Sequence, residues 1–328
     1  MAITTMNKYG FESVFADELT AYIDNKVASG FKAYSFTVYL RKFDAYCSSL
    51  NLIEPVFTVR DASGWLTKRD DEAVTSHYSR VNTSKNFLKY LSLKGYDVYV
   101  IRDARYIDTD FRPHIYTDKE ARKYFYQVDK FYLSKNKKVA VQYPVLFRTL
   151  YCCGTRINET LSIRKKDVDL EKGIILLTTT KNGKQRMVVM GEDLRRLYCK
   201  FADRTFYLLS DDDYIFTNSR GKRIDNKTIY NHHRIFLKRA GIPYVGGGEG
   251  LRVHDWRHHF IVYSFKQLSD SGLDMYTALP ILSTYAGHKT IFATEKYLRL
   301  TMELFPHIKN KIQEKVETIF GGNDHEDD

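Results

Sequence analysis

The sequence has few cysteines, no long apolar run and no leader-like start. Its 328 residues include four cysteines, none in a CxxC pair, so we expect reduced thiols and no disulfide framework. The absence of any run of about 18 apolar residues excludes a membrane-spanning helix. The opening MAITTMNKYGFESVF does not join a basic region to an apolar run, which argues against a signal peptide. Together these absences predict a cytoplasmic protein.

Charge is distributed unevenly along the chain. Residues 1–112 contain 15 basic and 14 acidic side chains, whereas the remainder contains 36 basic and 26 acidic ones. The net charge of +11 therefore comes almost entirely from the last two thirds of the sequence. A basic body of this kind favours a polyanionic partner, usually a nucleic acid, although a solvated basic surface has the same composition.

Apolar periodicity predicts a mostly helical protein with one small antiparallel β-sheet. Four amphipathic segments lie between residues 11 and 96, and a polar stretch with weak periodicity follows them. We therefore predict a helical domain over residues 1–101, a linker over 102–114, a second domain over 115–300, a C-terminal helix over 301–320 and an acidic, disordered tail over 321–328.

Local signals place several elements of the second domain. Thr117 and Glu120 form the pattern of a capping box, which marks the start of a helix. An apolar helix is expected to end at Gly154, and residues 173–190 are predicted to form a hairpin around an Asn-Gly pair. Further helices are predicted near residues 192–207, 226–240, 254–268, 274–286, 290–299 and 303–319.

The segment HDWRHHF, residues 254–260, allows two interpretations. His254 and His258 have the spacing of a zinc-binding helix, but Asp255 replaces the usual glutamate and no third ligand is evident, which disfavours a metal site. His254 and Arg257 also share one helix face, and the planar fork of an arginine fits two phosphate oxygens. Many helices carry such a pair in solvent, so the choice depends on the rest of the chain.

Three other segments decide between these interpretations. GTRINETL places Arg156 after a tight glycine turn at the start of a helix. The predicted hairpin carries Lys181 just before its turn, with Lys184 as a competitor across the turn. AGHKTIFATEKYLRL spaces His288 and Tyr297 nine residues apart. These residue types favour the phosphate interpretation, since they offer cations, proton donors and a nucleophile.

The order of these residues carries a family resemblance. An arginine, a lysine, His-x-x-Arg, Gly-His and a tyrosine follow one another, and this set resembles the motifs of the tyrosine recombinases, the phage integrase family. The family's motifs are close to G-x-R-x-x-E, a hairpin lysine, H-D-x-R-H, and L-G-H with a tyrosine nine residues later. The resemblance covers residues 117–300. Two departures, GTRI for G-L-R and Tyr285-Ala286 for a Leu-Leu pair, remove no reacting group.

The resemblance implies both a fold and an activity. The fold would be a helical, SAM-like core-binding domain followed by an α+β catalytic domain. The activity would be site-specific recombination or integration, in which DNA is cut and rejoined through a 3′-phosphotyrosine without metal or cofactor, and which moves a phage or transposon-like element. The main alternative is a non-cutting DNA-binding accessory protein or repressor. A metalloprotease and a type IB topoisomerase-like enzyme are weaker alternatives.

Each candidate catalytic residue takes an implied role from the resemblance. Tyr297 would be the nucleophile, whereas Tyr285 precedes the Gly-His pair and is expected to pack. Arg156 and Arg257 would bind the non-bridging phosphate oxygens as charge develops on them. Lys181 would be the acid that protonates the leaving 5′ oxygen. His254 would assist proton transfer from the tyrosine, and His288 would add a hydrogen bond to the phosphate. His258 is expected to pack or to form a supporting hydrogen bond.

Duplex DNA at specific recombination sites is the expected partner. The candidate DNA-contacting residues are Lys85, Lys89, Lys184, Arg186, His232, His233 and Arg234. The resemblance also implies a tetramer assembled on nucleoid DNA and allows for an accessory DNA-bending protein. An apolar stripe from Leu304 to Ile319 on the predicted C-terminal helix would pack either on its own core or on a neighbouring protomer.

Overall fold

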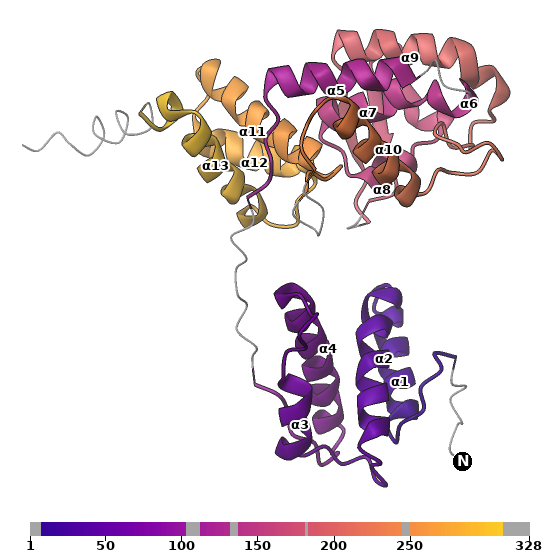
Figure 1. The fold of residues 1–328 in the computed structure, drawn as a ribbon, viewed down its shortest axis with the longest axis vertical. Helices are drawn as coiled ribbons and strands as arrows, with labels where there is room; N and C mark the ends of the chain where they lie inside the picture. Colours follow the sequence, from indigo (N-terminus) through magenta and orange to yellow (C-terminus); the bar gives the residue numbers. More distant parts are fainter. Residues whose placement is uncertain (1–7, 103–111, 132–136, 181–182, 245–249, 311–328) are drawn as a thin grey trace, which may run out of the picture. The chain divides into compact units, whose positions relative to one another are not determined.

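The computed structural model describes residues 8–102, 112–131, 137–180, 183–244 and 250–310. It divides into two compact units, residues 1–111 and residues 112–328, and each unit is described by itself (Figure 1). The boundary between the units falls inside the stretch predicted to be a linker. No helix in these described ranges is long and apolar enough to cross a membrane.

The first unit consists of the helices α1 (Ala16–Ala28), α2 (Tyr34–Ser49), α3 (Val59–Leu66) and α4 (Val74–Leu93). Each corresponds to one of the amphipathic segments in the sequence. Aromatic side chains fill the centre of the unit, where the Phe43 ring lies 5.2 Å from the Trp65 ring and 6.0 Å from the Phe87 ring. Burial of these large apolar surfaces is the main source of stability for the helices.

A buried ion pair fixes the connection between α3 and α4. The Arg80 side chain is 1% exposed and forms two 2.8 Å hydrogen bonds with the Glu72 carboxylate. Arg80 also donates hydrogen bonds to the backbone carbonyls of Trp65 and Thr67. These bonds from Arg80 lower the pKa of Glu72 to about 2. Removing either partner would leave the other charge buried without compensation.

The second unit is mostly helical and contains one small sheet. Its α-helices are α5 (Asp118–Lys130), α6 (Lys137–Ala140), α7 (Tyr143–Cys153), α8 (Ile157–Leu161), α9 (Glu192–Thr205), α10 (Asn226–Arg239), α11 (Asp255–Asp270), α12 (Met275–Ala286) and α13 (Phe292–Leu304). The unit also contains two 3₁₀ helices, η2 (Lys165–Asp167) and η3 (Phe206–Leu208). The sheet contains β1 (Val168–Asp169), β2 (Ile174–Leu177) and β3 (Arg186–Val189), paired antiparallel in this order. The predicted fold class, mostly α with a small antiparallel sheet, is confirmed.

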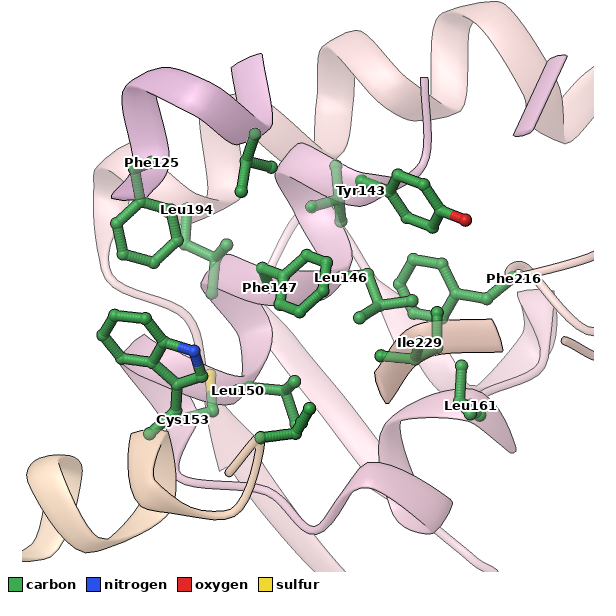
Figure 2. Close-up of a cluster of buried hydrophobic side chains, with 14 of the residues drawn as sticks. Phe125, Tyr143, Leu146, Phe147, Leu150, Cys153, Leu161, Leu194, Phe216 and Ile229 are labelled. Atoms are coloured by element: carbon green, nitrogen blue, oxygen red, sulfur yellow. The ribbon is translucent and has the colours of Figure 1, made fainter. Parts of the chain in front are cut away.

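Helix α7 lies at the centre of this unit and packs against α5, α8, α9 and α11. Its side chains Tyr143, Leu146, Phe147 and Leu150 are buried in the cluster drawn in Figure 2, together with residues of α5, α9 and α10. Trp256 of α11 belongs to the same cluster. Since α7 ends at the candidate site and α11 begins there, this core holds the two helix ends in fixed positions.

A second apolar cluster joins α11, α12 and α13. It contains Ile261 and Phe265 of α11, Leu282 of α12 and Leu298 of α13. Helix α11 therefore contributes to both clusters of the unit, with Trp256 in one and Ile261 in the other. This shared helix connects the end of α7 to α13 within one rigid packing arrangement.

Local predictions for this unit are confirmed at the capping box and corrected at the last helix boundary. The Thr117 hydroxyl accepts a hydrogen bond from the Glu120 amide, and the Glu120 carboxylate accepts one from the Thr117 amide. The predicted break near residue 300 is wrong, because α13 continues to Leu304 and the chain bends at Phe305. Phe305 precedes Pro306, and a residue before proline avoids the helical conformation. Residues 306–310 are again helical.

Candidate active site

The site begins at the turn that ends α7. Gly154 caps this helix with φ +58°, a left-handed conformation that favours glycine. A Cβ atom at this position would lie 2.2 Å from a ring carbon of Phe260, so a side chain is also excluded by contact. The predicted tight glycine turn is confirmed, and it delivers Arg156 to the N-cap of α8.

A buried carboxylate organises the arginines of the site. The Glu159 side chain is 1% exposed and accepts hydrogen bonds from Arg156 Nη1 at 2.8 Å and Arg186 Nη2 at 2.7 Å. Burial alone would raise the pKa of Glu159, but the bonds from Arg186 and from the Arg156 backbone and side chain lower this pKa to about 2. Glu159 is therefore ionised at neutral pH and holds both guanidinium groups.

Arg257 is the most buried cation of the site, with 1% of the residue exposed. It donates hydrogen bonds to the carbonyls of Gly154 at 2.7 Å and Ala286 at 2.5 Å. Arg156 donates to the neighbouring Gly287 carbonyl at 3.1 Å. Burial and the charge of Arg156 lower the pKa of Arg257 to about 9, which leaves it cationic at neutral pH. The two guanidinium groups thus converge on the turns that end α7 and α12.

Tyr297 of α13 lies beside these arginines and is 3% exposed. Its hydroxyl lies 2.7 Å from His258 Nδ1, and its ring is stacked 6.0 Å from the His288 ring. Burial raises the pKa of Tyr297 to about 12, although the charges of Arg257 and Arg156 act in the opposite direction. The phenol is therefore protonated at neutral pH, and it becomes a strong nucleophile only when its proton is removed.

Two histidines, His258 and His288, lie next to the tyrosine, and a third, His254, contacts His258. His258 is 5% exposed, whereas His254, at the N-cap of α11, is exposed. Their rings meet edge to face at 4.8 Å. His288 is half-buried and lies 2.6 Å from Thr294 Oγ1 through Nδ1, and burial lowers its pKa to about 3. From the sequence we expected His258 to pack or to form a supporting hydrogen bond. The spacing of the histidines along the chain could not show that this bond reaches Tyr297.

Comparison with known proteins identifies the family. The model of the phage integrase family matches residues 124–303, more than half of the chain. The chain belongs to the phage integrase family. An integrase/recombinase of Sinorhizobium fredii is 25% identical over 323 residues, which cover 93% of this chain and 99% of that protein. The tyrosine recombinase XerC of Rickettsia bellii is 26% identical over 252 residues, which cover 75% of this chain and 76% of XerC.

The fold also agrees with that of a solved site-specific recombinase. The XerH site-specific recombinase, bound to a palindromic difH substrate in a post-cleavage complex, superimposes with a TM-score of 0.65 at 18% identity. The match covers 87% of this chain and 79% of that one. With the family match and the sequence relatives, this places the chain among the tyrosine recombinases, a family that cleaves and rejoins DNA. The predicted family is confirmed.

Two residues that we expected to contact DNA serve the interior of the recombinase instead. Arg186 is 11% exposed on its side chain, binds Glu159 and donates from Nε to the Tyr285 carbonyl at 2.9 Å. Side chains alternate along β3, so Arg186 points to the same face as the buried Val188. The sequence pattern of period two could have revealed this orientation.

His233 is the second correction. It is 1% exposed, and its Nδ1 lies 2.7 Å from the Tyr124 hydroxyl. Burial lowers its pKa to about 3, so it is neutral in the folded recombinase. The reason is helical spacing, because His233 shares a face of α10 with the buried Ile229 and Phe236. A DNA contact from this side chain is excluded.

The other predicted DNA contacts have more suitable positions. Lys89 on α4, Arg234 on α10 and Lys184 before β3 are exposed, and Lys85 on α4 is half-buried. His232 is half-buried and lies 3.1 Å from the Tyr143 hydroxyl through Nδ1. Lys181, the predicted hairpin lysine, lies outside the described residues.

The described part of the recombinase contains no group of three or more His, Cys, Asp or Glu residues that could hold a metal ion. In particular, the His254 ring meets the His258 ring, and His258 Nδ1 meets the Tyr297 hydroxyl. The zinc-helix interpretation of HDWRHHF therefore has no ligand set in these residues. The arrangement instead offers two fixed cations, a phenol and three imidazoles around one position.

Proposed function

We propose that this recombinase cuts and rejoins DNA through a covalent bond between Tyr297 and a 3′ phosphate. The observation that carries the proposal is the convergence of Arg156 and Arg257 on the turns that end α7 and α12, with Tyr297 near enough for both charges to act on its pKa. Attack by the phenol oxygen would release a 5′ hydroxyl and conserve the phosphodiester energy. A 5′ hydroxyl from another strand could then reverse the step, so joining would need no ATP.

The two arginines would stabilise the charge that develops on the phosphoryl oxygens. Backbone carbonyls already orient both guanidinium groups, and Glu159 also holds that of Arg156, so little reorganisation is needed when DNA binds. Loss of one such donor typically lowers the rate by about 10²–10³. His254 is exposed next to these cations and could contact a phosphate directly.

The leaving oxygen needs a proton, because an alkoxide is a poor leaving group. We assign this proton to Lys181 on the hairpin, by the family resemblance. His288 would contribute a hydrogen bond to the phosphate, and its Nδ1 contact with Thr294 holds the ring in place. In this scheme, cationic side chains stabilise the transition state, and we propose that the reaction is metal-independent.

Covalent trapping tests this function. DNA that the protein retains is first selected from a random pool, and the selected site is nicked so that a short 5′-hydroxyl fragment dissociates after cleavage. We expect wild type to form a denaturant-resistant, protease-sensitive DNA adduct in the presence of EDTA, and Tyr297→Phe to form none. Tyr285→Phe is the matched control, because the Tyr285 ring packs on Phe260 with centroids 5.5 Å apart. An adduct in Tyr297→Phe would refute the assignment.

Duplex binding would use exposed and half-buried cations of both units. Lys85 and Lys89 lie one turn apart on α4, and Lys184 and Arg234 lie in the second unit. Each phosphate contact releases condensed counterions, so affinity should fall steeply with salt. Replacing Lys89 by alanine should weaken binding to all sequences alike and reduce the salt dependence. An unchanged salt dependence would show that this lysine does not face DNA.

We further propose that the recombinase assembles as a tetramer on two recombination sites, with room for an accessory DNA-bending protein, and that it moves a phage or transposon-like element. Of the apolar C-terminal stripe, Ile308 is fully buried in the core of its own unit and Leu304 is 44% exposed. The rest of the stripe lies outside the described residues. Truncation after Asn310 keeps Ile308 and should retain DNA binding but abolish tetramers. Tetramers that persist after this truncation would exclude a role of that segment in assembly.

A further inference from the structure

The Tyr297 hydroxyl is in direct contact with His258. The distance from the phenol oxygen to Nδ1 is 2.7 Å, and the two rings are 5.4 Å apart with a 32° interplanar angle. The two residues come from α11 and α13, which pack closely against each other. Both residues are at least nine-tenths buried, so the contact lies in a dry environment where a proton has few other acceptors.

The second ring nitrogen of His258 faces a buried carboxylate. Asp255 is 2% exposed, and its Oδ1 lies 3.9 Å from His258 Nε2. The same carboxylate accepts a 2.7 Å hydrogen bond from the Arg252 amide, which fixes its position at the start of α11. The carboxylate favours the imidazole tautomer that carries hydrogen on Nε2, because that hydrogen is attracted to Oδ1. Nδ1 then presents its lone pair to the Tyr297 hydroxyl.

His258 is neutral before DNA binds, so its lone pair is available, but its surroundings make it a weak base in the free protein. Burial and the neighbouring His254, Lys296, Arg252 and Arg257 lower the pKa of His258 to about 2, so the ring is neutral before DNA binds. A DNA phosphate would bring negative charge to the same group of cations and would make an imidazolium less unfavourable. The arrangement of nucleophile, base and orienting carboxylate is the one that activates hydroxyl nucleophiles in proteins.

We propose that His258 accepts the Tyr297 proton during cleavage and returns it during rejoining, with Asp255 orienting the ring. The inference rests on the proposed function of Tyr297. In the forward step the phenol O–H bond breaks and its proton moves to Nδ1. The phenol oxygen forms the bond to phosphorus, and the bond from phosphorus to the 5′ oxygen breaks. That oxygen takes its proton from a separate donor, which we assign to Lys181. His254 is then left to serve the phosphate rather than the tyrosine.

An asparagine substitution separates proton transfer from positioning. Its side-chain amide can reach about the place of Nδ1 and can hydrogen bond to the phenol, but it cannot take up a proton at neutral pH. General acid–base groups contribute about 10²–10⁴ to a rate. We therefore expect both His258→Asn and His258→Ala to slow single-turnover cleavage of the nicked site DNA by about 10²–10⁴. If His258→Asn cleaves within about threefold of wild type, His258 only positions the phenol and the proposal is wrong.

A sulfur substitution identifies which proton His258 handles. A site DNA with sulfur in place of the bridging 5′ oxygen has a leaving thiolate that needs no proton. A defect in donating a proton to the leaving group disappears on this substrate, whereas a defect in accepting the Tyr297 proton remains. We expect the His258→Asn defect to remain, and its disappearance would overturn the proposal. Asp255→Asn should show a smaller defect with the same behaviour.

The neighbouring histidine provides the matched control. His259 is 2% exposed and stacks on Tyr263, with ring centroids 4.1 Å apart, rather than on Tyr297. His259→Phe keeps a buried ring at this position and should cleave at the wild-type rate. Thermal melting and DNA affinity, measured for every variant, exclude misfolding as the cause of a slow reaction. Tyr297→Phe in the same experiment tests the proposed function alone, because loss of the adduct in this variant does not depend on which residue accepts the proton.

Discussion

Replacement of Glu159 by glutamine should reveal how much the buried carboxylate contributes to stability. The Glu159 side chain is 1% exposed and holds Arg156 and Arg186, so its charge is compensated almost entirely by these two residues. Its pKa is about 2 in the folded protein against an ordinary value of 4.5. This difference corresponds to about 3 kcal/mol of unfolding free energy at neutral pH.

The sign of the pH dependence follows from the direction of this pKa. Because the folded-state pKa lies below the ordinary one, the stabilisation is complete above pH 4.5 and is lost as the pH falls to about 2. Glutamine cannot ionise and has none of this pH-dependent stabilisation. We therefore expect Glu159→Gln to lower the free energy of unfolding by about 3 kcal/mol at pH 7 and by only about 1.5 kcal/mol at pH 3.

Tryptophan fluorescence during urea denaturation can measure this effect in the structural unit that contains Glu159. The chain has two tryptophans, Trp65 in the first unit and Trp256 in the second, so a Trp65→Phe background leaves a reporter only in the unit that contains Glu159. Glu171→Gln, at an exposed position, is the control and should change little at either pH. A Glu159→Gln effect of equal size at both pH values, or below about 1 kcal/mol at pH 7, would refute the reasoning.

Three further predictions concern the site and the first unit. Arg257→Ala should slow covalent adduct formation by about 10²–10³ at saturating DNA, and a rate within tenfold of wild type would exclude a role in the transition state. Gly154→Ala should lower the melting temperature and the cleavage rate together, because its methyl group would meet the Phe260 ring and its φ is positive; unchanged melting would show that the turn relaxes. Arg80→Met should destabilise the first unit by about 3–5 kcal/mol in urea denaturation, since it leaves Glu72 buried without a partner. A loss below about 1 kcal/mol would mean that water reaches this carboxylate.

Local features of the molecule were predictable because their causes lie within a few residues. The capping box at Thr117, the glycine turn at Gly154 and the helices from α7 to α12 depend on side chains close in sequence. The family could also be identified from the sequence, because the order and spacing of its polar motifs survive in the linear chain. The basic character of the last two thirds likewise indicated a polyanionic partner.

Contacts between distant elements were decided only by the tertiary structure. His254 and His258 lie on one face of α11, yet only the crossing of α11 and α13 determines that the Tyr297 hydroxyl meets His258 Nδ1. Arg186 and His233 are residue types that can contact DNA, but packing turns the first toward Glu159 and the second toward Tyr124. A sequence specifies which side chains share a face within one helix or strand. Which partner covers that face depends on how the elements pack, and this packing decides whether a polar side chain meets DNA, a buried carboxylate or the nucleophile.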